Sequence, residues 1–383
     1  QAGYAAAVDW VTDQSFSNGR FGLFGFSYLG ITAMHTAAQQ HPAVKTAFIG
    51  VPIGDVYRDL AFTGGQVNVT FLPLFLSLVS TLGVTNPSVL TDPSSGIPTI
   101  LEHINGAVSN QIPLLLNGLA GDDEVVLDNN YWKVRSPSET VSKINIPTFL
   151  IGSLQDLFQR STPMLYEAIK QNTTAKLLIM PGQHFQASFG FGLPADNVPV
   201  FNEIALRWFD QYLKEMDVGA DTIPNVTQYV TGLEHFVTSS DWPHPRAFAQ
   251  RLYLQPNKTL STSIPQVSSS SHTMLQQPLD GLCSVSTAQW TGGLLGLIPT
   301  PCTTDNRIAD ALSISYQTAP MEEDYYINGP MQADIWMATT ASDASLSVRI
   351  SDVSPSGAAV PLSNGLQAVS FRKVDESRSR KLD

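Results

Sequence analysis

The chain has 383 residues, enough for two or three domains with hydrophobic cores of their own. Hydrophobic residues make up 43% of it and charged residues 14%, which excludes a disordered chain. The formal net charge of -12 leaves no basic field for a phosphate backbone or an anionic membrane surface, so nucleic-acid binding is not expected. The longest nearly unbroken apolar stretch, 71–84, contains a proline and is shorter than the roughly 20 residues that cross a bilayer, so we expect no membrane span.

The opening of the chain predicts alternating helices and strands. Apolar residues at helical spacing indicate a helix that ends near residues 17–19. A short apolar strand over 21–26, a small-residue helix over 28–40 and a second strand over 44–51 follow. The continuous apolarity of the second strand is typical of a parallel sheet that is covered on both faces.

From 53 to 143 the rhythm of strands stops. Helical apolar segments at 71–84 and 98–119, followed by an acidic loop at 121–124, predict an inserted helical unit. The carboxylates of this region lack the spacing of a calcium loop, so a solvated acidic loop is favoured over a cation site; they are Asp122, Asp123, Glu124 and Asp128.

Strands and helices alternate again after the insertion. We expect strands over 147–152 and 175–180 and helices over 162–171 and 201–214, which predicts that the parallel sheet resumes. After residue 223 the pattern changes to short alternating segments broken by Pro, Gly, Ser and Asp. That pattern predicts an all-β domain over 224–383, a sandwich or a jelly roll.

The strongest chemical signal is the segment Gly25-Phe26-Ser27-Tyr28-Leu29-Gly30, between an expected strand and an expected helix. A nucleophile elbow needs that context, because its sharp turn lifts a serine Oγ out of the sheet and aims the next backbone N–H at an oxyanion. The second glycine comes one position later than in G-x-S-x-G, and Leu29 stands in its usual place. The segment predicts Ser27 as a nucleophile and the Tyr28 N–H as an oxyanion donor; the alternative is a glycine-rich strand exit with an incidental serine.

A nucleophilic serine needs a base, and the base needs an orienting carboxylate. In a sheet of this kind the acid and then the base follow the serine, each on a loop beyond the carboxyl end of a strand. Asp156 follows the strand over 147–152, and His184 follows the strand over 175–180, so we predict Ser27, Asp156 and His184 as a catalytic triad. None of the remaining histidines follows such a strand, and we expect them to be packed or solvated: His35, His41, His103, His235, His244 and His272.

These segments resemble one known family. GRFGLFGFSYLG resembles the G-R-V-G-x-x-G-x-S-Y-x-G signature of cocaine-esterase-like (CocE/NonD) hydrolases, relatives of the X-Pro dipeptidyl-peptidases, in which the displaced glycine is expected. IPTFLIGSLQDLF resembles the acid segment of that family, I-P-v-L-x-x-G-G-W-x-D-x-F, and MPGQH resembles its base segment, G-P-W-x-H. The matched residues are Asp156 and His184. Residues 319–365 are similar to the jelly-roll domain of the family.

The resemblance implies an α/β-hydrolase core over 1–52 and 144–223, a helical cap over 53–143 and an incomplete β jelly roll over 224–383. It implies a serine hydrolase that cleaves carboxylic esters through an acyl-enzyme, with amides as an open possibility. Such a hydrolase needs no metal or organic cofactor, and the molecule that it binds is a small ester or amide substrate. The oligomeric state and the acyl and alcohol groups stay open.

The chain departs from the family pattern at two places. Leu154 stands where the acid segment has Trp, and the Trp before the base is missing within residues 181–183, so the aromatic wall of the acyl pocket is expected to differ. In the α-amino-acid ester hydrolase branch, carboxylates two and three residues after the catalytic Asp hold a substrate ammonium; here those positions are Phe158 and Gln159. An ammonium without a partner is costly to bury, so no strong preference for α-amino acyl groups is expected.

Two other functions compete with the esterase. An X-Pro dipeptidyl-peptidase would need a site for the substrate's N-terminal ammonium, and the sequence offers none that we identify. A catalytically silent binding protein that keeps the fold is the other alternative, since a fold does not guarantee an activity.

One strand precedes the elbow, whereas an α/β-hydrolase sheet has several, and the last strand-like segment lies close to residue 383. We expect the chain to be truncated at both ends, and the 383 residues alone to be poorly soluble, inactive or dependent on a complementing segment. The family resemblance implies a second oxyanion donor, a tyrosine hydroxyl, from a loop outside the sequence.

The compartment is predicted from composition. Cys283 and Cys302 lie in one stretch rich in Gly, Pro, Ser and Thr, and lysines are few, as in many exported proteins. We expect a Cys283–Cys302 disulfide and an extracellular or cell-envelope location; unpaired thiols and a cytoplasmic location are the alternatives.

Overall fold

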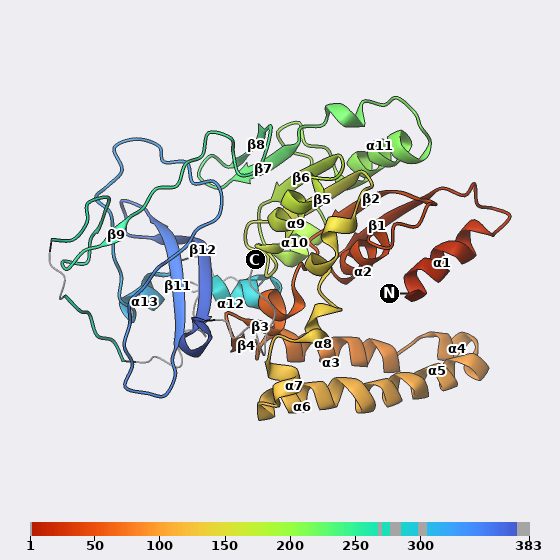
Figure 1. Cartoon of the computed structure of the whole chain (residues 1–383), viewed down its shortest axis with the longest axis horizontal. Coiled ribbons are helices and arrows are strands. Elements are labelled where there is room, and N and C mark those ends of the chain that lie inside the picture. The colour runs from red at the N-terminus through yellow and green to blue at the C-terminus, as the bar shows by residue number, and fades with distance from the viewer. Residues whose placement is uncertain (1, 267–269, 276–284, 298–304, 374–383) are drawn as a thin grey trace.

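The computed structural model describes residues 2–266, 270–275, 285–297 and 305–373. At the centre of this part of the chain lies a six-stranded sheet in the order β1-β2-β5-β6-β7-β8 (Figure 1). Strands β1 to β7 of this sheet run parallel, and β8 pairs antiparallel with β7. Its strands are β1 Phe21–Phe26, β2 Val44–Gly50, β5 Thr148–Ser153, β6 Ala175–Met180, β7 Val226–Val230 and β8 His235–Ser239.

Helices cover both faces of the sheet. On one face, α1 (Ala2–Thr12), α2 (Tyr28–Ala37) and α9 (Ser161–Ile169) share one hydrophobic core with the strands. On the other face, α11 (Phe201–Leu213) inserts its fully buried Trp208 among the strand residues. Every residue of β5 and β6 is buried, as continuous apolar strands between two helical layers require. The expected α/β-hydrolase core is therefore confirmed.

The sheet extends beyond residue 223, where the sequence predicted a change to a separate all-β domain. Residues of β7 pair with β6, with Val226 opposite Leu177, and β8 continues the same sheet. The buried amine of Lys176 in β6 donates hydrogen bonds to the carbonyls of Asp221 and Ile223 and so draws the chain before β7 alongside β6. Residues 226–239, which the sequence predicts as the start of the β domain, therefore extend the central sheet; alternation along a strand does not reveal which sheet it joins.

The chain between β2 and β5 forms the expected helical insertion, the cap, which projects below the sheet in Figure 1. The observed α3, Phe71–Val84, has the bounds that the sequence predicted. The other elements of the cap are η1 Tyr57–Ala61, β3 Phe62–Thr63, β4 Gln66–Val67, α4 Ser88–Thr91, α5 Pro93–Gly106, η2 Ala107–Gln111, α6 Ile112–Ala120, α7 Asp123–Val126, α8 Asn130–Lys133, η3 Pro137–Glu139 and η4 Val141–Lys143.

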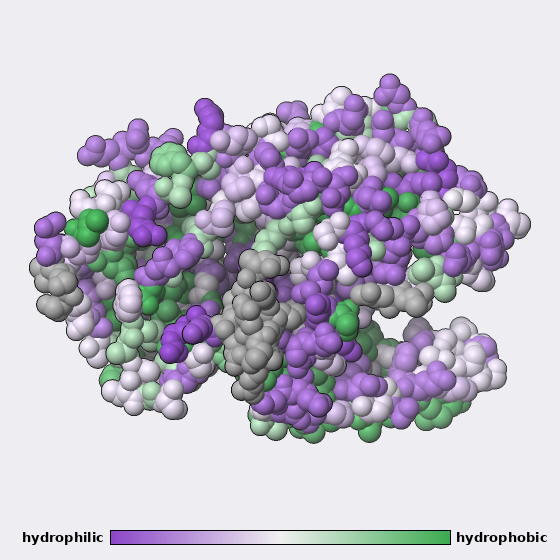
Figure 2. All heavy atoms as spheres, in the orientation of Figure 1, coloured by the Kyte–Doolittle hydropathy of each residue, from purple (hydrophilic) through white to green (hydrophobic). Residues whose placement is uncertain are grey.

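Much of the apolar surface of the cap faces outward. None of the residues of α3 or α6 is buried, and Figure 2 shows hydrophobic side chains along the lower edge of the cap. By length and composition, residues 71–91 are the one stretch of the described chain that could cross a membrane. The α3 helix itself ends at Val84 and rises about 21 Å, short of the roughly 30 Å hydrocarbon core. The described residues therefore contain no clear membrane span.

The remaining elements form the β-rich C-terminal region. Strands β11 and β12 make a long antiparallel hairpin, and β9 and β10 pair separately. The two packed sheets of a jelly roll do not form within the described residues, so that arrangement stays a prediction. Cys283 and Cys302 lie outside the described residues. The elements are β9 Tyr253–Leu254, β10 Leu260–Ser261, α12 Val285–Trp290, η7 Leu295–Leu297, α13 Arg307–Ala311, β11 Ser345–Val353, β12 Ala359–Ala368 and η9 Val369–Phe371; α10 (His184–Ser188) and η5 (Ala220–Thr222) belong to the core.

Candidate active site

Ser27 occupies a sharp turn between β1 and α2. Its backbone has φ 55° and ψ −123°, a strained conformation for a residue with a side chain, and its N–H donates to the Gly50 carbonyl at 2.9 Å. The turn closes because Gly25 and Gly30 have no side chains. A Cβ on Gly25 would lie 2.4 Å from the Leu29 carbonyl oxygen, and one on Gly30 would lie 3.0 Å from that of Gly50. The displaced second glycine is therefore a packing requirement of this elbow.

The three residues predicted as a triad lie together at the carboxyl ends of β1, β5 and β6. The Ser27 Oγ is 2.7 Å from the His184 Nε2, and the His184 Nδ1 is 2.8 Å from the Asp156 Oδ1. Because Nδ1 faces a carboxylate, it carries the ring proton, which leaves Nε2 to accept a hydrogen bond from the serine hydroxyl. The Asp156 and His184 side chains are buried. The arrangement can take a proton from Ser27 and hold the resulting imidazolium beside a carboxylate.

Local contacts fix the orientation of the acid and the base. The Asp156 Oδ1 also accepts a hydrogen bond from the backbone N–H of Phe158 at 3.0 Å. The Phe158 ring meets the His184 imidazole edge to face, with 5.2 Å between the ring centroids. Phe158, which replaces a carboxylate of the α-amino-acid ester hydrolase pattern, is thus an apolar wall for the base.

The backbone N–H of Tyr28 is available to an oxyanion. Tyr28 is the first residue of α2, where a backbone N–H has no acceptor within its own helix. The N-terminus of a helix also favours negative charge, so a developing oxyanion beside Ser27 would be stabilised there.

An aromatic surface lies beside the serine, and the first turns of α3 contribute to it. The ring of Phe75 is 6.3 Å from that of Tyr28 and stacks on Phe71 at 5.7 Å. Phe71 packs in turn against the buried cluster of Ile53, Leu157 and Phe158. A helix as apolar as α3 can line an acyl pocket or form the core of the cap. Its first turns contact the surroundings of Ser27, and its remaining turns are exposed rather than a core.

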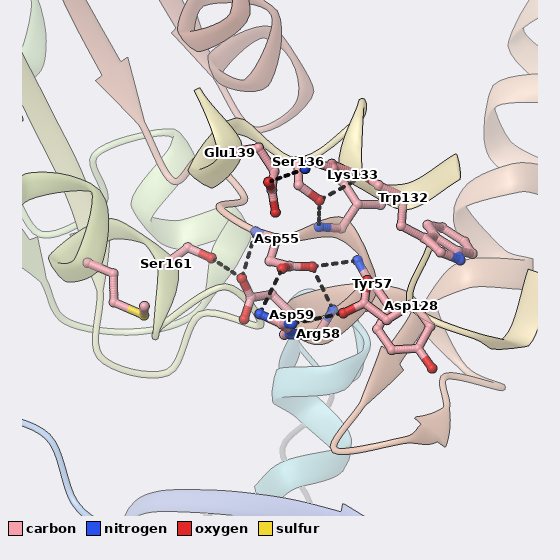
Figure 3. Close-up of polar contacts among 12 residues, drawn as sticks. Asp55, Tyr57, Arg58, Asp59, Asp128, Trp132, Lys133, Ser136, Glu139 and Ser161 are labelled. Carbon is pink, nitrogen blue, oxygen red and sulfur yellow. Dashed lines mark hydrogen bonds and ion pairs between the residues drawn. The ribbon is translucent and has the colours of Figure 1, made fainter. Parts of the chain in front are cut away.

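A polar cluster around the buried Asp59 joins the cap to the acid loop (Figure 3), and sequence patterns did not predict it. The Asp59 Oδ1 accepts hydrogen bonds from Nε and Nη2 of Arg160, each at 2.8 Å. Its Oδ2 accepts from the Ser161 hydroxyl at 2.8 Å and from the backbone N–H of Asp55 at 2.9 Å. Arg160 lies four residues after Asp156, so these contacts hold the acid loop from the side of the cap.

The acidic residues of the loop at 121–124 separate in the structure. Asp122, Asp123 and Glu124 are exposed, and Asp122 caps α7 by accepting from the Glu124 N–H. Asp128 instead is buried and forms an ion pair with Arg58 at 3.0 Å. Among the described residues, no group of three or more His, Cys, Asp or Glu side chains is arranged to hold a metal ion.

Two family models together match most of the chain. Residues 1–186 match the model of the X-Pro dipeptidyl-peptidase (S15 family), and residues 218–383 match that of the X-Pro dipeptidyl-peptidase C-terminal non-catalytic domain. The cocaine esterase of Rhodococcus sp. (strain MB1 Bresler) is 26% identical over 405 residues, which cover 96% of this chain and 68% of that protein.

Solved structures show the same fold. An aminopeptidase from a marine sediment archaeon, Thaumarchaeota archaeon, has a TM-score of 0.66 at 18% identity, over 97% of this chain and 65% of that one. An α-amino acid ester hydrolase has a TM-score of 0.65 at 22% identity, over 96% of this chain and 65% of that one. The chain spans about two thirds of the length of these proteins.

Proposed function

The chain belongs to the cocaine-esterase-like relatives of the X-Pro dipeptidyl-peptidases, a family of serine hydrolases, and from this premise we propose that it cleaves carboxylic esters. The observation that carries the proposal is the unbroken relay from the Ser27 Oγ through the two nitrogens of His184 to Asp156. Ser27 is the nucleophile, His184 the general base and acid, and Asp156 the orienting carboxylate.

The reaction has two halves. The Ser27 Oγ attacks the ester carbonyl while His184 takes its proton, and the Tyr28 N–H donates to the oxyanion. His184 then gives the proton to the departing alcohol, and the acyl group stays on Ser27. Water, activated by the same imidazole, attacks the acyl-enzyme and releases the acid. The Asp156 carboxylate stabilises the imidazolium in both halves.

The surroundings favour an apolar acyl or alcohol group. Phe71, Phe75 and Tyr28 offer aromatic surface beside the serine, and Phe158 covers one side of the base. Amides are the harder substrates for the same machinery, because an amine leaves less readily than an alcohol. We therefore propose ester hydrolysis as the main activity and amide hydrolysis as the slower one.

The peptidase alternative needs a carboxylate that is free to bind a substrate ammonium. The nearby carboxylate of Asp59 is engaged by Arg160 and Ser161, and Phe158 and Gln159 follow the acid. An aminoacyl ester should therefore be hydrolysed no faster than its des-amino analogue. Measuring kcat/KM for such a pair tests this point, and a large advantage for the amino compound would favour the peptidase-like alternative.

Hydrolysis of p-nitrophenyl esters by the natural-length protein tests the activity itself. We expect Ser27→Ala to remove ester hydrolysis down to the background, with an unchanged melting temperature. Ser315→Ala, on an exposed serine of the β-rich region, is the matched control and should keep the wild-type rate. Activity that survives in Ser27→Ala would contradict the proposal, and a folded wild-type protein without esterase activity would favour the silent binding protein.

A further inference from the structure

A short segment of the C-terminal region, residues 285–297, lies against the loop that carries the catalytic acid. It comprises α12 and η7, and Figure 1 shows α12 between the β11–β12 hairpin and the hydrolase core. Gln289 of this segment is 4% exposed, and its Nε2 donates to the backbone carbonyl of Asp156 at 2.8 Å. The acid loop is thus held from two sides, by Arg160 and Asp59 at the cap and by Gln289 at the C-terminal region.

The same segment contacts the loop that carries the base. The Gly292 carbonyl accepts a hydrogen bond from the backbone N–H of Phe185, the residue after His184, at 3.2 Å. The two chains lie so close that a Cβ on Gly293, which has φ +97°, would be 2.9 Å from the Gln183 Oε1. One segment therefore contacts the chain next to both members of the Asp–His pair.

The orientation of the Gln289 amide is fixed by its other partner. Its Oε1 accepts a hydrogen bond from the Nδ2 of Asn364, in β12, at 2.6 Å. With the oxygen engaged by an amide donor, the nitrogen must face the Asp156 carbonyl, which accepts hydrogen bonds and donates none. A chain of hydrogen bonds thus runs from the β11–β12 hairpin through Gln289 to the backbone of the catalytic acid.

We propose that Gln289 is a positioning residue for hydrolysis, which fixes the Asp156 backbone and thereby the distance between the Asp156 carboxylate and His184. The inference rests on the proposed function, and it gives the region that matches a non-catalytic domain model a part in catalysis. Catalytic groups must be held within about 0.5 Å of their productive geometry. A buried carbonyl without a donor is also unfavourable, so we expect the loop of Asp156 to shift until its carbonyl finds another donor or water.

Gln289→Met tests the proposal, because methionine keeps the length of the side chain and loses both hydrogen bonds. In the natural-length protein we expect kcat for a p-nitrophenyl ester to fall about 10- to 100-fold. The KM should change by less than about twofold, because the lost contact acts on the transition state rather than on substrate binding. Gln332→Met, at an exposed glutamine of the same region, is the matched control and should leave both constants unchanged.

A spectroscopic readout separates this inference from the proposed activity. The Nδ1 proton of His184, hydrogen-bonded to Asp156, should give a low-field proton resonance that disappears in Asp156→Asn. We expect that resonance to move upfield or broaden in Gln289→Met and to stay in place in Gln332→Met. If the wild-type protein hydrolyses no ester but Gln289→Met still moves the resonance, the activity is wrong and the positioning role holds. Wild-type kcat and an unmoved resonance in Gln289→Met would overturn the role.

If Gln289→Met does not fold, Asn364→Leu tests the same chain of hydrogen bonds. Asn364 contacts Gln289, and we expect its loss to release the amide and lower kcat several-fold with the KM unchanged. Where both variants fold, the double variant should be no slower than Gln289→Met alone, because both changes break one chain of hydrogen bonds. Fully additive losses, or a wild-type kcat in Asn364→Leu, would overturn the relay.

Discussion

The central sheet and the cap are both rich in apolar residues, but the two regions bury them differently. Every residue of β5 and β6 is buried, whereas none of α3 is, although α3 has no charged residue. The strands lie between two layers of helices, whereas the cap helices project below the sheet (Figure 1). Apolar composition alone therefore does not predict burial; the number of layers around an element decides it.

The difference matches a division of labour in the proposed mechanism. The acid and the base follow strands whose residues are all buried, so the groups that move protons are supported by the core of the molecule. The cap brings its aromatic residues to the serine from an open helical unit. Chemistry is thus assigned to the sheet and substrate contact to the cap.

The largest expected difference between the two regions is in kcat, after substitution of the carboxylate that follows β5 and of one in the cap. Asp156→Asn should lower kcat by about 10⁴-fold, because the amide no longer holds the imidazole in the tautomer that activates Ser27. Asp123→Asn, at an exposed acid of the cap, should leave kcat unchanged. Steady-state hydrolysis of a p-nitrophenyl ester measures both. Equal effects would remove the distinction between the two regions.

Two leucines compare the stability of the regions directly. Leu150 in β5 is fully buried, so Leu150→Ala should lower the free energy of unfolding by about 2–5 kcal/mol. Leu82 in α3 is 63% exposed, and Leu82→Ala should change it by less than about 0.5 kcal/mol. Urea denaturation followed by circular dichroism provides both values. A large loss in Leu82→Ala would show that α3 is covered in solution.

The contact between the two regions depends on Asp59. Asp59→Asn replaces one carboxylate oxygen by a donor that faces Arg160 or Ser161, so we expect the free energy of unfolding to fall by about 1–3 kcal/mol. Asp92 is the exposed N-cap residue of α5, and its side chain accepts a hydrogen bond from the Ser94 N–H. Asp92→Asn keeps an oxygen for this hydrogen bond, so it should lower the free energy of unfolding by less. The same urea experiment applies. An equal loss in both variants would argue against a role of Asp59 in holding the cap to the core.

The smallest expected effect is a pH dependence on the sheet side. Burial of His35 in α2 lowers the pKa of its imidazole from the ordinary value of 6.5, against the effect of its hydrogen bond to the Arg135 carbonyl. The unfolded chain then binds the proton more readily, so this contribution to stability is complete above pH 6.5 and is lost as the pH falls toward the lowered pKa. His35→Phe should flatten the pH dependence of the melting temperature below pH 6.5, whereas His235→Gln, at an exposed residue, should not.

Local sequence patterns predict much of the fold and of the candidate site. The bounds of α3 and the strands at 21–26 and 175–180 follow from mainly apolar runs between turn residues. The proximity of Ser27, Asp156 and His184 follows from one rule, that the carboxyl ends of parallel strands meet at one edge of a sheet. The elbow with its displaced glycine adds a local signal that marks Ser27 among the serines of the chain.

The remaining features depend on contacts that no local pattern encodes. The strand over 226–230 alternates as a strand of a separate β domain would, but it pairs with β6, and the buried amine of Lys176 bonds to the chain just before it. The contact between Gln289 and Asp156 joins residues 133 positions apart, and nothing around Gln289 marks it among the other glutamines. Asp128 was grouped with an exposed acidic loop, although Arg58 draws it into the interior.

Reaction of the natural-length protein with a fluorophosphonate, followed by peptide mapping, tests the central claim most directly. The account predicts one phosphonylated serine at the site, Ser27, with labelling that is abolished in Ser27→Ala and strongly slowed in His184→Ala, because the hydroxyl is a weak nucleophile without its base. Labelling at another serine, or a Ser27 adduct that forms as fast in His184→Ala as in the wild type, would contradict it.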